Sequence, residues 1–184
     1  YVSLLLSKAV AENKINMNDS VNKYLKLDNN KYYPTIERLV THTSGYKSYY
    51  FENQMIANKF SQDNDFYGIS KNDILNKVDS IKLEDKDYEF QYSNFGISVL
   101  GLILEEVYDK DFTTLMNEFM TDEIGQKNTK VAIFKGNLDK YWNWKKDDGY
   151  IPAGAIISNI EDMAKYLQIY LNSDEKYIVN TYTP

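Results

Sequence analysis

The chain has no cysteine and a single histidine, His42, among its 184 residues. Without cysteine it can form neither a disulfide framework nor a thiolate metal site, and one histidine leaves only scattered carboxylates as further metal ligands. We therefore expect no metal site and no cofactor. The lack of cysteine fits both a reduced cytosol and cysteine-free secreted proteins, so by itself it leaves the compartment open.

Clustered positive charge and long apolar runs are also missing. Arg38 is the only arginine, and 27 acidic residues outnumber 21 basic ones to give a net charge of -6. Nucleic acid binding needs clustered cations, so we expect no nucleic acid partner. Apolar runs are short, and Leu4-Leu5-Leu6 is interrupted by Ser7 and Lys8, which predicts no membrane span in this chain.

Several catalytic motifs are absent as well. The sequence contains no P-loop and no G-x-G-x-x-G, and no G-x-S-x-G elbow accompanies His42 for a Ser-His-Asp triad. A lone histidine at a helix end is usually a structural hydrogen-bonding residue. On this interpretation Gly45 is the left-handed residue that closes the helix before it.

What is present is typical of one globular domain. The chain is 43% hydrophobic and 15% aromatic, and its length suffices for a core of its own. We therefore expect residues 1–184 to form a single domain. Residues Val2 to Ala11 are apolar around most of a helical circumference, which predicts a buried helix. Because that is unusual for a solvated terminus, we expect the chain to enter mid-helix and the domain to be truncated.

Most of the chain has the pattern of helix. An acid follows Ser70 and Ser158 at the spacing of a capping box, which predicts helices at about 71–79 and 159–172. Further helices are expected at 94–108 and 112–120, and the strand candidate is 131–134. In the 159–172 helix a stripe at helical spacing predicts a core-facing side made of Ile160, Met163, Ala164, Leu167 and Leu171.

One route to a serine nucleophile is the S-x-x-K pattern, in which one helical turn brings a lysine amine beside the hydroxyl. It begins at Ser20, Ser44 and Ser173, although chance alone supplies about one match. None of the three opens a buried helix: they lie in a polar run, beside a glycine turn and at an exposed helix end. We therefore expect none of them to be a nucleophile.

The pattern Tyr-x-Asn also occurs three times, at Tyr92, Tyr141 and Tyr170, where chance predicts about two. Only Tyr92 precedes a glycine-spaced apolar helix. Two interpretations of Tyr92-Ser93-Asn94 follow. It is a helix start with Asn94 as cap and Tyr92 as a partly buried aromatic, or a catalytic phenol held beside an amide.

Four blocks occur in one order along the chain, as listed here: NKINMNDSVNKYL (13–25), IERLVTHTSGY (36–46), FQYSNFGISVLGLILEEV (90–107) and YIPAGAIISNIEDMAKYL (150–167). In this order they resemble the serine β-lactamase and penicillin-binding protein superfamily. The resemblance is to its branch of class C β-lactamases, D-alanyl-D-alanine carboxypeptidases and related esterases. It covers residues 1 to about 172, and Ala155 departs from it because glycine is usual there.

The resemblance implies an α+β fold of the β-lactamase/transpeptidase type, with this chain covering mainly the helical part and little of the antiparallel sheet. It also implies that the S-x-x-K serine and lysine precede Tyr1 and that the Lys-Thr-Gly-type strand follows the last helix. One oxyanion N–H belongs to that serine and the other to that strand. We therefore expect the chain as given to be inactive, because the nucleophile is absent.

The implied activity is that of a serine hydrolase, which forms an acyl-enzyme with a D-Ala-D-Ala-type peptide, a β-lactam or an ester. Tyr92 would shuttle the proton with lysine cations nearby, and Asn94 would bind the substrate. Family members act mostly at the cell wall, so the resemblance implies an extracytoplasmic location, in the cell envelope or secreted.

Two alternatives remain open. One is a non-catalytic relative that serves as a peptidoglycan- or β-lactam-binding module or sensor. The other is a purely structural helical domain, which would give Tyr92 neither neighbouring lysines nor a cleft.

Overall fold

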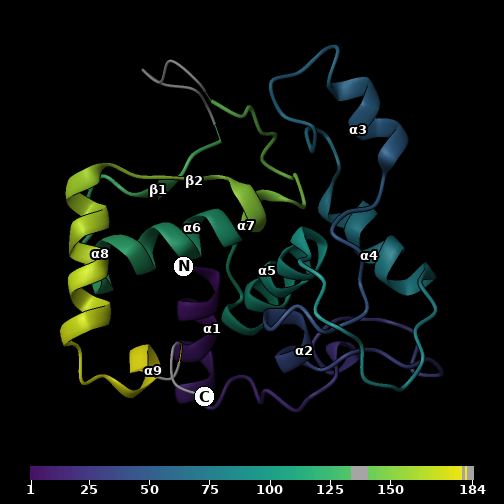
Figure 1. The fold of residues 1–184 in the computed structure, drawn as a ribbon, viewed down its shortest axis with the longest axis horizontal. Helices are drawn as coiled ribbons and strands as arrows, with labels where there is room; N and C mark the ends of the chain where they lie inside the picture. The colour runs from purple at the N-terminus through teal and green to yellow at the C-terminus, as the bar shows by residue number, and fades with distance from the viewer. Residues whose placement is uncertain (134–140, 180, 182–184) are drawn as a thin grey trace.

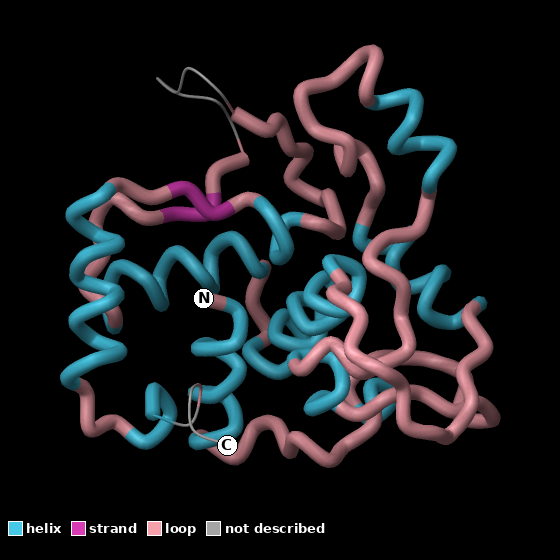
Figure 2. Tube along the Cα trace, in the orientation of Figure 1, coloured by secondary structure: helices cyan, strands magenta, loops and turns pink. Residues whose placement is uncertain are grey.

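The computed structural model describes residues 1–133, 141–179 and 181, and in this part of the chain it is mostly helical (Figures 1 and 2). Its elements are α1 (Val2–Ala11), η1 (Val21–Lys23), α2 (Ile36–Val40), α3 (Glu52–Asn58), α4 (Lys71–Ser80), α5 (Asn94–Tyr108), α6 (Phe112–Glu118), the π-helical turn η2 (Phe119–Glu123), β1 (Lys130–Val131), α7 (Ile151–Gly154), β2 (Ile156–Ile157), α8 (Ile160–Asn172) and α9 (Lys176–Val179).

The sheet consists of two short strands. β1 and β2 pair antiparallel, with Lys130 opposite Ile157 and Val131 opposite Ile156. The expected strand at 131–134 therefore lies one residue earlier and ends at Val131, while Phe134 falls outside the described residues. The predicted fold class, α+β with mainly its helical part present, is confirmed.

Helix α5 occupies the centre of the fold. It contacts α1, α2, α4, α6 and α7, which surround it in Figure 1. The side chains of Phe95, Val99, Leu100, Ile103 and Leu104 are fully buried. A helix that is apolar on all sides is stable only inside a core, so the position of α5 is fixed from every direction.

The contact between α5 and α7 depends on a glycine. A Cβ added at Gly101 would lie 2.1 Å from Cγ and 2.6 Å from Cβ of Pro152, well inside van der Waals contact. The proline ring thus packs directly on the backbone of α5. This contact joins the apolar helix of the third sequence block to the Pro-Ala-Gly segment of the fourth.

Helix α1 confirms the expectation of a buried helix. Leu4, Leu5, Leu6 and Ala9 are buried, and the helix packs against α5 and α9. Within the described residues no helix is both long enough and apolar enough to cross a bilayer.

The two expected capping boxes have different outcomes. In α4 the Ser70 hydroxyl accepts the Asp73 N–H at 3.1 Å, and the Asp73 carboxylate accepts the Ser70 N–H at 2.8 Å, which confirms the box. In α8 the cap is Asn159, whose side chain accepts the Asp162 N–H at 2.9 Å. The prediction for Ser158 is wrong because its hydroxyl pairs with that of Thr129 at 2.7 Å.

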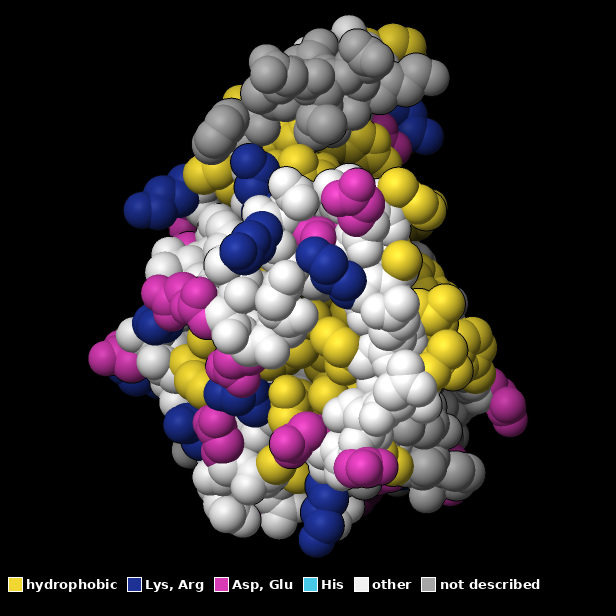
Figure 3. Space-filling view, turned by 90° about the vertical axis from the view of Figure 1, so that its left-hand side faces the viewer, with side chains coloured by type: hydrophobic (Ala, Val, Ile, Leu, Met, Phe, Trp, Pro, Cys, Tyr) yellow, Lys and Arg dark blue, Asp and Glu magenta, His cyan; other side chains and the backbone are white. Residues whose placement is uncertain are grey.

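The stripe expected to be the core face of α8 is exposed, so that prediction is wrong. Ile160 is 83% exposed and Leu171 73%, and Met163, Ala164 and Leu167 are exposed as well. Figure 3 looks at the side of the molecule where α8 lies, and hydrophobic side chains gather along one edge of that face.

Polar anchoring explains the rotation of α8. Asp162 is fully buried, and its carboxylate accepts the Asn128 N–H at 2.7 Å and lies 3.1 Å from the Thr129 hydroxyl. On the same side of the helix, the ring of Tyr166 packs on that of Tyr1 with centroids 4.3 Å apart. These contacts turn Asp162 and Tyr166 inward, so the aliphatic stripe points outward.

The Gly101 contact yields a stability prediction. Gly101→Ala forces a methyl group into the Pro152 ring, and overpacking of this kind costs about 1–3 kcal/mol. That exceeds the roughly 1 kcal/mol that alanine gains over glycine in a helix, so we expect a lower free energy of unfolding in urea titrations. The matched control is Gly154→Ala, whose Cβ meets only the Trp142 and Trp144 ring edges at 3.3 and 3.4 Å. Equal stability of the two variants would contradict the tight contact.

Candidate active site

Tyr92-Ser93-Asn94 lies where the chain enters α5, and Ser93 is the residue that caps the helix. The Ser93 hydroxyl accepts the Gly96 N–H at 2.9 Å and donates to the Lys47 carbonyl at 2.7 Å. Ser93 is fully buried, so both bonds are shielded from water. Asn94 is therefore the first helical residue, and the interpretation of Asn94 as the cap is wrong.

Tyr92 and Asn94 differ from Ser93 in their side chains, although the Asn94 backbone carbonyl does accept the Ser98 hydroxyl at 3.0 Å. Among the described residues, no group hydrogen-bonds the Tyr92 phenol or the Asn94 side-chain amide. Tyr92 is 55% exposed, so it is buried only in part. The structure thus presents a free phenol and a free amide two residues apart at the end of a rigid helix.

The turn after α2 holds this segment in place. The Gln91 N–H donates to the His42 carbonyl at 2.8 Å, and the Ser93 N–H donates to His42 Nδ1 at 3.1 Å. Two residues further along, the Phe95 N–H donates to the Ser48 carbonyl at 3.1 Å. The second and third sequence blocks therefore meet in space, which their separation along the chain does not reveal.

His42, and not Gly45, closes α2. His42 has φ +60° directly after the C-cap Thr41, and the Thr43 N–H bonds back to the Arg38 carbonyl at 2.9 Å. The expected role of Gly45 is therefore wrong. Gly45 has φ +80° three residues later, where a Cβ would lie 2.9 Å from the Tyr88 ring. The expectation that His42 is a structural hydrogen-bonding residue is confirmed.

The three S-x-x-K serines make other contacts. The Ser20 hydroxyl donates to the Tyr33 carbonyl at 3.0 Å, the Ser44 hydroxyl accepts the Tyr46 N–H at 3.2 Å, and the Ser173 hydroxyl accepts the Glu175 N–H at 3.1 Å. Lys23 instead pairs with Asp19 at 2.6 Å. In the described ranges none of these serines bonds its lysine, which agrees with the expectation that none is a nucleophile.

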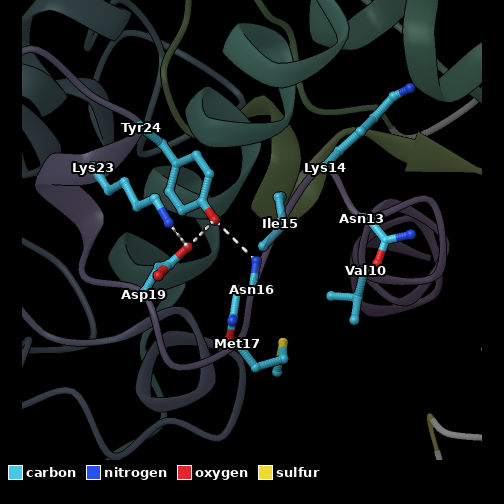
Figure 4. A pocket seen from close by; sticks show the side chains of 9 residues that line it. All are labelled: Val10, Asn13, Lys14, Ile15, Asn16, Met17, Asp19, Lys23 and Tyr24. Atoms are coloured by element: carbon cyan, nitrogen blue, oxygen red, sulfur yellow. Dashed lines mark hydrogen bonds and ion pairs between the residues drawn. The ribbon is translucent and has the colours of Figure 1, made fainter.

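A groove opens beside the first of these motifs (Figure 4). It is lined by Val10, Asn13, Lys14, Ile15, Asn16, Met17, Asp19, Lys23 and Tyr24. Its central polar atoms are paired with one another: the Tyr24 hydroxyl accepts the Asn16 N–H at 2.9 Å and donates to Asp19 at 2.6 Å. Burial and the bond to Asp19 raise the pKa of Tyr24. No lining residue belongs to the Tyr92 segment.

One feature expected at a catalytic tyrosine is not found in the described part of the chain. No lysine ammonium there bonds the Tyr92 phenol or lies over its ring, and Lys47 instead lies over Tyr50 at 5.9 Å. The same ranges contain no group of three histidine or acidic side chains arranged to hold a metal ion. The described residues thus supply Tyr92 with access to solvent but with no cation.

Comparison with known proteins identifies the family. The family model described as Beta-lactamase matches residues 1–180, nearly the whole chain. The chain belongs to the β-lactamase family. Among curated relatives of this β-lactamase-family chain is Protein flp of Staphylococcus aureus (strain MW2), 24% identical over 196 residues. That match covers 96% of this chain and 38% of flp, so the chain spans well under half of that relative's length.

Solved structures show the same fold. The octameric penicillin-binding protein homologue from Pyrococcus abyssi is 22% identical with a TM-score of 0.71, and the match covers 99% of this chain and 46% of that one. The β-lactamase/D-alanine carboxypeptidase from Yersinia pestis, complexed with citrate, is 17% identical with a TM-score of 0.76, covering 99% and 55%. The family model over residues 1–180 confirms the expected serine β-lactamase and penicillin-binding protein superfamily, and these structures show that the fold agrees with it.

The candidate site of this β-lactamase-family chain includes one residue whose contact the sequence does not reveal. His42 contacts the Tyr92 segment from 51 positions away, whereas the pattern around it indicates only a local helix end. The sequence does mark His42, because it lies in the THTSG segment of the second block. Nothing in that segment indicates which residue His42 contacts in space.

Ser93 and Asn94 should differ in how much they contribute to the free energy of unfolding. Ser93→Ala removes the cap and leaves the Lys47 carbonyl without its donor, so it should cost at least about 0.5–2 kcal/mol in the free energy of unfolding. Asn94→Ala removes an amide that has no described partner and should stay within about 0.5 kcal/mol. Chemical denaturation of both variants measures the difference. If Asn94→Ala proved as costly as Ser93→Ala, Asn94 would be a structural residue.

Proposed function

We propose that this chain is part of a serine hydrolase that acts through an acyl-enzyme on a D-Ala-D-Ala-type peptide, a β-lactam or an ester. The observation that carries the proposal is the free phenol of Tyr92 beside the free amide of Asn94, at the start of the buried helix α5. Side chains with no structural use, held on a rigid element in a family of this kind, are suited to contact a substrate.

In the proposed mechanism a serine hydroxyl attacks the substrate carbonyl and water later releases the acyl group. Tyr92 accepts the hydroxyl proton during the attack and passes it to the leaving group. A free phenol has a pKa near 10, so a neighbouring cation is needed to favour proton transfer at neutral pH. We expect an S-x-x-K motif outside these 184 residues to supply both the serine and that cation.

Asn94 is proposed to bind the substrate. Its amide N–H is a donor for the substrate carbonyl, and its oxygen is an acceptor for a nearby lysine. Such contacts fix the orientation of the reacting groups, which is a large part of the rate that enzymes gain from binding. The partner is thus a small molecule or a peptide that resembles peptidoglycan. An extracytoplasmic location, in the cell envelope or secreted, belongs to the same proposal.

A second candidate function is a non-catalytic peptidoglycan- or β-lactam-binding module. It is favoured by the lack of any lysine at Tyr92 among the described residues. Such a module would bind the same ligands through Asn94 but would not turn them over. Turnover of a β-lactam, a D-alanyl peptide or an ester by the unsubstituted full-length protein therefore separates the two functions.

The isolated chain of 184 residues should not be acylated by a labelled penicillin, because none of its S-x-x-K serines is paired with its lysine. Intact mass spectrometry after incubation measures the adduct. A stoichiometric adduct would contradict the prediction, and its peptide map would show which serine is the nucleophile.

In a full-length protein that carries this chain with an upstream S-x-x-K motif, Tyr92→Phe keeps the ring but deletes the phenol. We expect turnover to fall by roughly 10²- to 10⁴-fold, the usual loss when a general acid or base is removed. Because no described residue hydrogen-bonds the phenol, the melting temperature should be unchanged. Steady-state kinetics with a β-lactam, a D-alanyl peptide and an ester test this.

Tyr141→Phe and Tyr170→Phe are the matched controls. Tyr141 donates to the Ala132 carbonyl at 2.5 Å, and Tyr170 accepts from Tyr166 at 3.1 Å, so both phenols already have protein partners. These variants should lose stability while turnover stays within a few-fold. Full turnover of Tyr92→Phe on all three substrate types would show that Tyr92 does not shuttle the proton, and Tyr92-Ser93-Asn94 would then be only a helix start.

A further inference from the structure

His42 contacts Tyr92 from three directions. Its carbonyl accepts the Gln91 N–H at 2.8 Å and its Nδ1 accepts the Ser93 N–H at 3.1 Å, so it bonds the amides on both sides of Tyr92. Its ring also packs against the Tyr92 ring, with centroids 4.7 Å apart and planes tilted by 40°. Among the described residues no other ring packs against Tyr92.

The backbone of His42 is strained to make these contacts. A residue with φ +60° is in the left-handed region, which glycine occupies freely and a residue with a side chain occupies at an energetic cost. Helix ends of this shape usually carry glycine. Strain of this kind persists where the surroundings require it and is concentrated at functional sites.

The bond to Ser93 fixes the protonation state of the imidazole. Because Nδ1 accepts the Ser93 N–H, it carries no proton, and the proton of the neutral ring lies on Nε2. Protonation of Nδ1 would turn the acceptor into a donor that faces another donor. The bond would then break, and Tyr92 would lose its support on the side nearer to α5.

We propose that neutral His42 is the positioning residue of this site, which holds Tyr92 and Asn94 in their catalytic arrangement through the Ser93 N–H and the Tyr92 ring. This inference rests on the proposed function for its consequence in turnover, but its geometric part does not. It predicts a site that works only while His42 is deprotonated.

The groups around His42 indicate that its own protonation, and not that of a charged neighbour, sets this dependence on pH. Tyr92 is the titratable group whose ring packs against the imidazole, and the Phe90 ring lies nearly perpendicular to the imidazole with the two centroids 5.8 Å apart. The neighbouring Thr41 and Thr43 hydroxyls hydrogen-bond each other at 2.9 Å. Lys47 contributes a carbonyl, which accepts from Ser93. Among the described residues no charged side chain pairs with the imidazole.

Burial lowers the pKa of His42 from its ordinary value of 6.5. The folded chain therefore takes up this proton less readily than the unfolded chain. The contribution of His42 to stability is complete above pH 6.5 and is lost as the pH falls through the folded value. Any loss of turnover that depends on His42 must follow the same lower midpoint.

The first test uses NMR on the chain of 184 residues and requires no activity. We expect the Nε2–H tautomer of His42 at neutral pH. The Ser93 amide and the Tyr92 ring resonances should shift on acidification with the midpoint of His42, below 6.5. An Nδ1–H tautomer, or a Ser93 amide that ignores that midpoint, would overturn the proposal.

The second test uses kinetics of the full-length protein. His42→Gly keeps the left-handed backbone but deletes Nδ1 and the ring, so turnover should fall by about 10- to 100-fold, as a small misplacement of reacting groups costs. The acid limb of its pH profile at the His42 midpoint should also disappear. His42→Asn, which tolerates the same backbone and offers an acceptor that does not titrate, should recover part of the turnover without that limb.

Asp109→Gly is the matched control, because Asp109 also ends a helix, α5, with a left-handed φ of +48°. It should leave turnover and pH profile unchanged. If Tyr92→Phe lowers turnover but His42→Gly keeps normal turnover and its acid limb, the positioning role fails and the proposed function stands. If the full-length protein has no turnover, the proposed function fails, and if Tyr92→Phe has no effect on turnover, the catalytic role of Tyr92 fails; in both cases the NMR titration still decides whether His42 holds the segment. Should His42→Gly fail to fold, His42→Asn and that titration decide.

Discussion

The burial of α5 on every side is the constraint on which the rest of the structure depends. Its residues contact five other helices, and at Gly101 the backbone itself meets the Pro152 ring. A helix packed in this way cannot rotate or slide without opening the core, because protein interiors are close-packed. Asn94, the first residue of α5, is therefore held in place by the packing of the core, although it is only half-buried itself.

This restraint matters because Tyr92 is exposed and Asn94 is only half-buried. The Ser93 hydroxyl accepts the Gly96 N–H at the start of the helix and donates to the Lys47 carbonyl. Tyr92 and Asn94 therefore lie on either side of a buried, hydrogen-bonded residue. A site placed at the end of a rigid element keeps its geometry without further ordering when a ligand arrives. The capping interaction and the functional arrangement are thus one local structure, in which the middle residue is structural and its neighbours are free.

Local sequence patterns predicted the elements that depend on local physics. The Ser70–Asp73 box and the apolar segment of α1 are as expected, because caps and circumferential hydrophobicity act within a few turns. The stripe of α8 was misjudged because periodicity shows that a face is apolar and not that another element covers it. The buried Asp162, which is hydrogen-bonded to Asn128 and Thr129, sets the rotation of that helix. These partners lie more than thirty positions away in the sequence, so a local pattern cannot predict the contact.

The candidate site divides in the same way. Tyr92 and Asn94 were predicted from four weak blocks taken together, since Tyr-x-Asn alone is no more frequent than chance. The part of His42 was not predicted, because a histidine after a helix is read as a local terminator, and here it is that as well. One residue closes α2 with a left-handed backbone and supports the next block through its carbonyl, Nδ1 and ring. Glycine would close the helix at lower cost but would offer neither Nδ1 nor a ring, so the strained histidine is explained by its contact with Tyr92-Ser93 and not by the helix it ends.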